Sequence, residues 1–170
     1  MKAILLTVVA ASLMAGCASR KPIVVPHVPF DVAEYEAFSR PGTGVIKGQV
    51  FAKTIGGDVK KGAGNSVTLM PATKYREGWY WQAKNQGRAM PPGDSRHLQY
   101  DQTKVTDGEG RFEFKDIPAG QYYLVSQISW ETVSSNQYSR RLGLTDTQGG
   151  LVLGSVKVEN DKTAEVMLTR

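Results

Sequence analysis

Residues 106–120, TDGEGRFEFKDIPAG, are the stretch of sequence that decides the fold. Phe112 and Phe114 lie two residues apart, so in an extended strand their side chains leave the same face. Gly110 precedes them and can adopt the positive φ of a turn that ends in a bulge. The proline and glycine of residues 118–120 then reverse the chain. Because these residues form no catalytic or metal-binding set, the stretch is predicted to be scaffold.

The same alternation continues along most of the chain. In residues 121–130, Tyr122 and Leu124 share a face with Trp130 and are expected to enter the same core. Strands are expected over residues 44–52, 66–70, 104–106, 111–115, 121–130, 151–158 and 163–169, with loops that include residues 54–65 and 131–149. Many short strands with frequent turn signals and little helix predict an all-β fold, a seven-stranded β-sandwich.

A family resemblance rests on the same residues. The pattern Thr106-Asp107-x-x-Gly110-x-Phe112-x-Phe114, followed by Ile117-Pro118-x-Gly120-x-Tyr122-x-Leu124, resembles the carboxypeptidase regulatory-like domain. GVIKGQV at residues 44–50 is similar to the first strand of that domain. The resemblance covers residues 43–170 and implies a transthyretin-like (prealbumin-like) or Ig-like sandwich without peptidase activity. Asp107 is expected to brace its turn through hydrogen bonds to the backbone.

An aromatic-rich insertion, residues 72–103, interrupts the regular strands. Loops of this length inside a compact domain are often functional. Residues 72–82 are expected to form a short helix or packed turn, followed by an exposed loop. Trp79, Tyr80 and Trp81 are adjacent, so they cannot all face one way. Either Trp79 packs on the sandwich together with Tyr75, or the aromatic residues form a platform that stacks on sugar or docks a protein.

The N-terminus has the pattern of an export signal. An apolar run, residues 3–15, is shorter than the about 20 residues that a membrane-spanning helix needs. Leu13-Met14-Ala15-Gly16-Cys17 resembles the lipobox of bacterial lipoproteins, which implies removal of a signal peptide, residues 1–16, and acylation of Cys17, with palmitate as one chain. A plain secretory signal with an incidental cysteine is the alternative. No aspartate follows Cys17, which under the enterobacterial sorting rule implies the outer membrane.

Residues 17–42 are expected to link the lipid to the domain. Their prolines favour extended backbone and a semi-rigid tether. A short helix is expected over residues 31–40, where Asp31 can cap the first turn and Glu34 completes an approximate capping box.

Charge and side-chain chemistry argue against several function classes. The net charge is +5, but basic residues are scattered rather than gathered in a stripe, so no nucleic-acid binding is predicted. His27 and His97 lack neighbouring ligands at zinc-like spacing, so no metal site is predicted. No G-x-S-x-G nucleophile motif occurs, and acylation would block Cys17. We therefore expect no enzymatic activity and no cofactor.

The sequence thus predicts an exported, lipid-anchored protein of the bacterial cell envelope. Its expected role is that of a non-catalytic interaction or structural module with an envelope protein or glycan as partner. The expected contact residues lie in the insertion and are Trp79, Tyr80, Trp81 and His97. The alternative is a carbohydrate-binding module for peptidoglycan or a surface polysaccharide, which would require an exposed aromatic pair.

Overall fold

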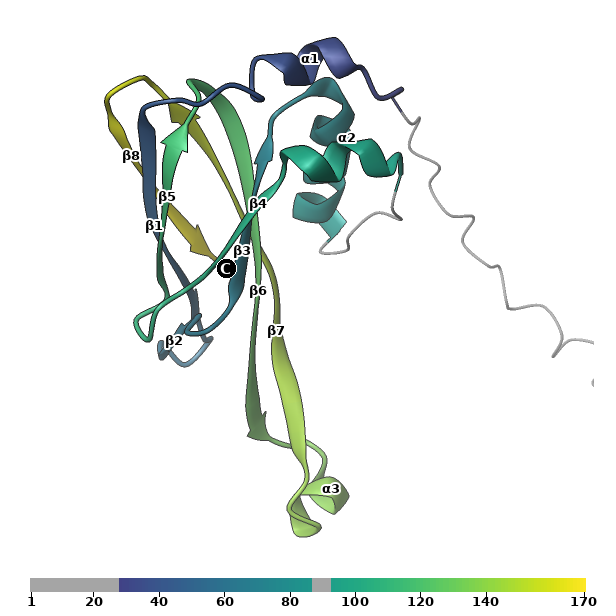
Figure 1. Cartoon of the computed structure of the whole chain (residues 1–170). Helices are drawn as coiled ribbons and strands as arrows, with labels where there is room; N and C mark the ends of the chain where they lie inside the picture. Colours follow the sequence, from purple (N-terminus) through teal and green to yellow (C-terminus); the bar gives the residue numbers. More distant parts are fainter. Residues whose placement is uncertain (1–27, 87–92) are drawn as a thin grey trace, which may run out of the picture.

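The computed structural model describes residues 28–86 and 93–170 (Figure 1). The predicted signal peptide, Cys17 and the first part of the tether lie outside the described residues. In order, the elements are α1 (Val32–Glu36), β1 (Gly44–Lys53), β2 (Val59–Lys61), β3 (Ser66–Pro71), α2 (Lys74–Gln86), the 3-10 helix η1 (Ser95–Tyr100), β4 (Gln102–Val105), β5 (Arg111–Ile117), β6 (Gly120–Val133), α3 (Gln137–Arg141), β7 (Thr145–Val158) and β8 (Thr163–Thr169).

The strands form two four-stranded sheets. In the first sheet, β1 pairs with β8 in parallel, and with β5 and β2 in antiparallel orientation. The second sheet has the order β4-β3-β6-β7 and is antiparallel throughout. The two sheets pack face to face (Figure 1), which confirms the predicted all-β sandwich.

The core lies between the sheets and comes from the alternating positions of both. Its members are Ile46, Val50, Ala52, Val67, Leu69, Phe112, Phe114, Ile117, Tyr122, Leu124, Ile128, Val152, Val156, Val158, Val166 and Leu168. Burying one large apolar side chain of this kind contributes about 1.5–3 kcal/mol relative to leaving it exposed. The interior residues expected from period-two alternation are therefore the ones that stabilise the sandwich.

The turn before β5 has the predicted construction. Asp107 Oδ1 accepts hydrogen bonds from the backbone N–H groups of Glu109 and Arg111, both at 2.8 Å. Gly110 has a φ of 77°, and a Cβ there would lie 2.5 Å from the carbonyl oxygen of Val50. At the next turn, the Tyr122 hydroxyl donates to the Pro118 carbonyl at 2.9 Å. These residues hold β5 and β6 in place.

The described residues form eight strands, one more than expected. The extra strand is β2, which lies in the predicted loop of residues 54–65 and pairs with the end of β1. Its only partly buried residue is Lys60, so it lacks the apolar alternation from which a strand is predicted.

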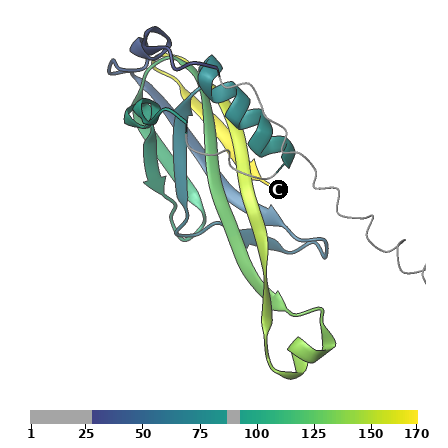
Figure 2. The same ribbon diagram turned by 90° about the vertical axis from the view of Figure 1, so that its right-hand side faces the viewer.

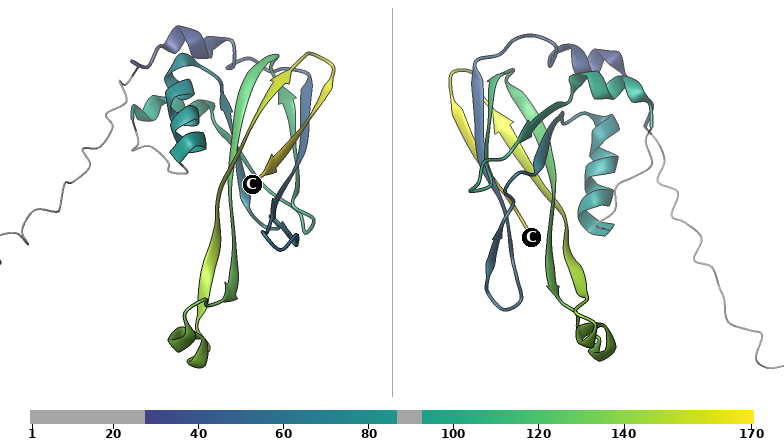
Figure 3. Two further views of the ribbon diagram at one scale, coloured as in Figure 1. Left: turned by 180° about the vertical axis from the view of Figure 1, so that it is seen from behind. Right: turned by 60° about the horizontal axis from the view of Figure 1, so that its bottom comes forward.

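Residues 131–149 are not the irregular connection that we expected. β6 and β7 stay paired out to Val133 and Thr145, and α3 lies at the tip of this long hairpin (Figures 1 and 3). Glu131 helps to hold the two strands together, since its carboxylate accepts from the hydroxyls of Thr145 and Thr147 at 2.6 and 2.7 Å. The hairpin projects beyond the sandwich, so it has no core-facing side and no apolar alternation.

The helical segments also differ in length from their predictions. α1 ends at Glu36, and Asp31 caps it as expected by accepting from Ala33 N–H at 3.0 Å. Glu34 does not complete a capping box, because it accepts from the backbone N–H of Lys74 at 3.0 Å and so joins α1 to α2. Part of the predicted exposed loop is helical, since α2 extends to residue 86 and η1 follows. Within residues 28–86 and 93–170, no helix is long and apolar enough to span a membrane.

Candidate functional site

α2 lies across the outer face of the sheet that contains β3, β6 and β7 (Figure 2). Tyr80 fixes it there by stacking on Tyr123 of β6, with ring centroids 4.0 Å apart. Tyr80 is 4% exposed and Ala83 is fully buried, so these two residues form the inner side of α2. The central aromatic residue of the predicted platform is therefore part of a packing interface.

A second aromatic cluster joins the insertion to the N-terminal helix. The Tyr35 ring lies 4.9 Å from that of Phe30 and 4.6 Å from that of Tyr100. Tyr75 packs edge-on against Phe30, with ring centroids 5.7 Å apart, and its ring lies 5.4 Å from that of His97 at a tilt of 38°. His97 is 7% exposed, and its Nδ1 is hydrogen-bonded to the carbonyl oxygen of Asp94. This arrangement gives His97 a packing position inside the insertion.

A buried ion pair also holds the insertion. Arg76 of α2 binds the carboxylate of Asp101, which precedes β4, and both side chains are about nine-tenths buried. Burial raises the pKa of Asp101, and the positive charge of Arg76 opposes that effect. Together with the aromatic cluster, this pair makes most of the described insertion a structural layer on the sandwich.

Trp81 is the exposed member of the predicted contact residues. Its side chain is 47% exposed, Trp79 is half-buried, and Tyr80 and His97 are buried. The Lys84 ammonium lies 5.1 Å from the centroid of the Trp81 ring. The four residues therefore do not form one continuous platform, because the helix turns Tyr80 inward and Trp81 outward.

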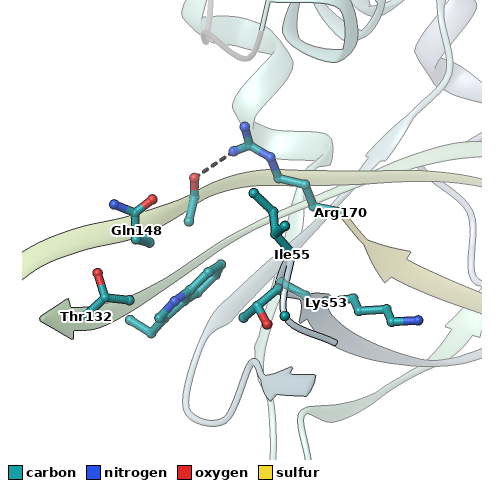
Figure 4. A pocket seen from close by; sticks show the side chains of 10 residues that line it. Lys53, Ile55, Thr132, Gln148 and Arg170 are labelled. Atoms are coloured by element: carbon teal, nitrogen blue, oxygen red, sulfur yellow. Dashed lines mark hydrogen bonds between the residues drawn. The ribbon is translucent and has the colours of Figure 1, made fainter. Parts of the chain in front are cut away.

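A pocket of about 420 Å³ lies where the β6–β7 hairpin leaves the sandwich (Figure 4). Its lining comes from the end of β1 and the loop after it, from the hairpin, and from the residue after β8. The lining residues are Ala52, Lys53, Thr54, Ile55, Gly56, Trp130, Thr132, Gln148, Gly149 and Arg170. We refer to it as the Trp130 pocket.

Strand register explains how the wall of this pocket is built. Trp130 lies opposite Gln148 across the hairpin, and Thr132 follows two residues later on the same face. Arg170 crosses from the end of β8 and donates to the carbonyl oxygen of Gly149 at 2.6 Å (Figure 4). Ile55, in the loop after β1, is fully exposed and also lines the pocket. An aromatic ring, an amide, a hydroxyl and a guanidinium therefore border one cavity.

Sequence reasoning missed this site because it assigned Trp130 to the core. Trp130 does pack against the core cluster, but it is only partly buried and its remaining surface lines the pocket. Two signals pointed to the site. Thr132 is the next residue on the face of Ile128 and Trp130, and it is polar where an interior residue would be apolar. The pair Gly149-Gly150, with φ values of 126° and 149°, marks the point where the hairpin leaves the sandwich.

A second pocket, of about 410 Å³, shares Arg170 with the first. It lies between the end of α2 and strands β7 and β8, and its lining residues are Ala83, Lys84, Asn85, Leu151, Leu153, Thr169 and Arg170. We refer to it as the Lys84 pocket.

A further hollow beside the β5 turn contains Lys47 and Glu113, which pair with each other at 3.5 Å. Within the described part of the chain, no three His, Cys, Asp or Glu side chains are grouped to hold a metal ion.

Comparisons with known proteins identify an extensive similarity. The chain is 34% identical to a candidate carbohydrate-binding protein from Pseudomonas aeruginosa, with a TM-score of 0.71 to its crystal structure. That match covers 85% of this chain and 100% of the Pseudomonas chain. A minor pilin of Streptococcus agalactiae matches with 15% identity and a TM-score of 0.39, over 76% of this chain and 44% of the pilin. Neither a protein-family model nor a curated protein matches the sequence, so the carboxypeptidase regulatory-like resemblance stays a prediction.

Proposed function

Because this chain belongs to the family of that Pseudomonas aeruginosa protein, we propose that it binds carbohydrate and that the Trp130 pocket is its binding site. The observation that carries the proposal is the partly exposed face of Trp130, placed beside the polar groups of Thr132 and Gln148. Ligand sites generally combine an apolar or aromatic surface with a few polar groups that set orientation. A sugar ring fits this combination, since its C–H face is apolar and its edge carries hydroxyl groups.

We propose a binding role rather than a catalytic one. Glycoside hydrolysis generally uses two carboxylates that flank the scissile bond. The described side chains that line the Trp130 pocket include no aspartate or glutamate carboxylate. This composition supports retention of a sugar without its cleavage. Incubating the protein with each oligosaccharide that it binds and analysing the products by mass spectrometry would detect any turnover, and a cleaved product would refute the proposal.

Isothermal titration calorimetry against a panel of peptidoglycan fragments, chitohexaose and surface polysaccharides tests the binding function. We expect at least one glycan to bind wild-type protein and to bind the Trp130→Ala variant at least tenfold more weakly. Val59→Ala is the matched control, because Val59 is exposed on β2 and does not line the Trp130 pocket. Circular dichroism would confirm that each variant is folded. Equal affinity of wild type and Trp130→Ala for every glycan that binds would rule out the site.

Lipid anchoring at Cys17 is the second part of the proposal. The lipobox-like sequence of residues 13–17 supports export, cleavage and acylation, and Ala18 and Ser19, in place of an aspartate after Cys17, support the outer membrane as the destination. Two or more acyl chains bind a membrane stably, because each buried methylene contributes about 0.8 kcal/mol. Labelling cells with radioactive palmitate should mark the wild type and leave Cys17→Ser unmarked. An unlabelled wild-type protein in the soluble fraction would support the plain secretory signal instead.

A protein partner at the insertion is a second candidate function, which the exposed side chains of Trp81 and Leu98 favour. Aromatic residues are enriched at the energetic centres of protein interfaces. Pull-down from envelope extract would compare wild type with Trp81→Ala/Leu98→Ala. Identical sets of captured proteins would remove this candidate.

A further inference from the structure

We infer that the ligand is an anionic sugar chain, which stacks one unit on Trp130, places a carboxylate on Arg170 and continues into the Lys84 pocket. The inference rests on the proposed carbohydrate binding and adds the ligand's charge and length. Its starting point is that Arg170 lines both pockets and so forms a shared wall between them. A ligand that fills both pockets therefore passes Arg170, whose guanidinium lies at the carbonyl oxygen of Gly149.

The side-chain charges along this path have one sign. Lys53 and Arg170 line the first pocket, and Lys84 and Arg170 line the second, whereas neither lining contains an acidic side chain. Figure 4 shows the Lys53 side chain directed away from the other labelled residues and Arg170 directed toward the hairpin, so Arg170 is the cation closest to the wall formed by the hairpin. This differs from the hollow beside β5, where Lys47 and Glu113 compensate each other.

The nearest carboxylates on the hairpin are already engaged. Asp146 lies opposite Thr132, two residues closer to the tip than Gln148, and accepts from the backbone N–H of Ser135 at 3.1 Å. Glu131 lies on the opposite face and binds two threonine hydroxyls. Within residues 28–86 and 93–170, neither carboxylate pairs with Arg170, whose guanidinium donates one hydrogen bond of 2.6 Å to the neutral carbonyl of Gly149. The positive charge of Arg170 is therefore available to a ligand.

A uronic acid is the sugar that fits these groups. The planar guanidinium of arginine carries five N–H donors and matches a carboxylate in a fork-like geometry. Lys84, beside Asn85, offers a second cation in the neighbouring pocket, and Trp81 adjoins it with its ring 5.1 Å from the Lys84 ammonium. Two cations and two tryptophans at separate points favour a chain of several units over a single sugar.

The experiment compares acidic oligosaccharides with neutral forms of the same backbone. Hexamers of galacturonate, mannuronate and glucuronate, each beside its methyl ester, would be titrated calorimetrically at low and high salt. We expect at least one acid form to bind about tenfold more tightly than its ester at low salt, with the preference falling as salt screens the charges. Arg170→Gln and Lys84→Gln should each reduce that preference several-fold. Lys157→Gln is the matched control, since Lys157 is 73% exposed and lines neither pocket.

The outcomes separate this inference from the proposed function. If neutral glycans bind as tightly as acidic ones and binding still requires Trp130, the protein binds carbohydrate but the inference is wrong. If Lys157→Gln weakens acid binding as much as Arg170→Gln, the preference reflects net charge and the inference is also wrong. If dimers bind as tightly as hexamers, the ligand does not extend into the Lys84 pocket. If no acidic hexamer binds but a neutral glycan of the first calorimetric panel does, the inference is wrong and the proposed function stands. If no glycan of either panel binds, both proposals fail.

Discussion

Tyr80 of α2 and Tyr123 of β6 stack with ring centroids 4.0 Å apart and ring planes inclined by 11°. This contact attaches the inserted helix to the outer face of the sandwich and determines which aromatic side chains remain on the surface. Because successive helical residues are rotated by about 100°, burial of Tyr80 turns Trp81 outward.

Replacing Tyr80 by alanine should therefore loosen α2 from the sheet. We expect Tyr80→Ala to lower the free energy of unfolding by about 3 kcal/mol, near the lower end of the range for a buried large aromatic side chain. Trp81→Ala, at an exposed neighbouring position, should change it by about 0.5 kcal/mol or less. Urea denaturation followed by circular dichroism would measure both. Equal effects of the two substitutions would contradict the packing described above.

The buried pair Arg76–Asp101 gives a second stability prediction. Removing one partner of a buried ion pair leaves an uncompensated charge, so Asp101→Ala should destabilise the protein by about 3–5 kcal/mol. Lys162→Ala is the comparison, because Lys162 pairs with Glu159 at 2.5 Å but is 70% exposed, so its loss should lower stability far less than that of Asp101. A double variant with apolar residues at both positions 76 and 101 should recover part of the loss. Asp101→Ala as stable as wild type would show that the pair does not hold the insertion.

Alternation and turn residues predicted the sandwich well because they report directly on burial. Phe112 and Phe114, and across the next turn Tyr122 and Leu124, face the core as their spacing requires. The hairpin beyond Trp130 was missed for the same reason, since it projects from the sandwich and its strands are paired by backbone and threonine–glutamate hydrogen bonds. Pattern reasoning detects strands with one buried face and overlooks strands that have none.

The candidate site could be predicted only in part. The aromatic insertion was recognised, yet which of Trp79, Tyr80 and Trp81 faces outward depends on the contact with Tyr123, more than 40 residues away in sequence. The Trp130 pocket needs three distant segments, which contribute Ile55, Gln148 and Arg170. No local pattern relates such positions, because only the pairing of the strands brings them together.

The turn before β5 contains two glycines, Gly108 and Gly110, whose alanine substitutions can be compared directly. Gly110→Ala would force a positive φ on alanine and place its Cβ 2.5 Å from the Val50 carbonyl oxygen, so we expect a loss of about 1–3 kcal/mol. A Cβ on Gly108 meets nothing within 4 Å, so Gly108→Ala should change stability by about 0.5 kcal/mol or less. Thermal unfolding would compare the melting temperatures of the two variants with that of wild type. Similar melting temperatures would show that the turn tolerates a side chain at both positions.

Acid should weaken the same turn through Asp107. The backbone N–H of Arg111, followed by that of Glu109, holds the pKa of Asp107 below its usual value of 3.8. An acid whose pKa is lowered by folding contributes stability that is complete above its unfolded pKa and is lost as the pH falls through the folded pKa. Asp107→Asn should therefore melt below wild type at pH 7, and the difference should shrink between pH 4 and pH 2. A constant difference over that interval would show that ionisation of Asp107 does not stabilise the turn.

Substitutions of Trp130 and Gln148, which lie opposite each other across the hairpin, should affect glycan binding and folding stability differently. Trp130 contacts the core as well as the pocket, so Trp130→Ala should both weaken glycan binding at least tenfold and lower the free energy of unfolding by about 1–3 kcal/mol. Gln148 is exposed, so Gln148→Ala should leave stability within about 0.5 kcal/mol of wild type. Its affinity for glycan should still fall about fivefold, as expected from loss of one hydrogen bond of about 1 kcal/mol. Calorimetric titration of a glycan that wild type binds, combined with thermal unfolding, would measure both quantities. If Gln148→Ala kept full affinity, the polar edge of the Trp130 pocket would not take part in recognition, and the ligand would have to contact Trp130 from another direction.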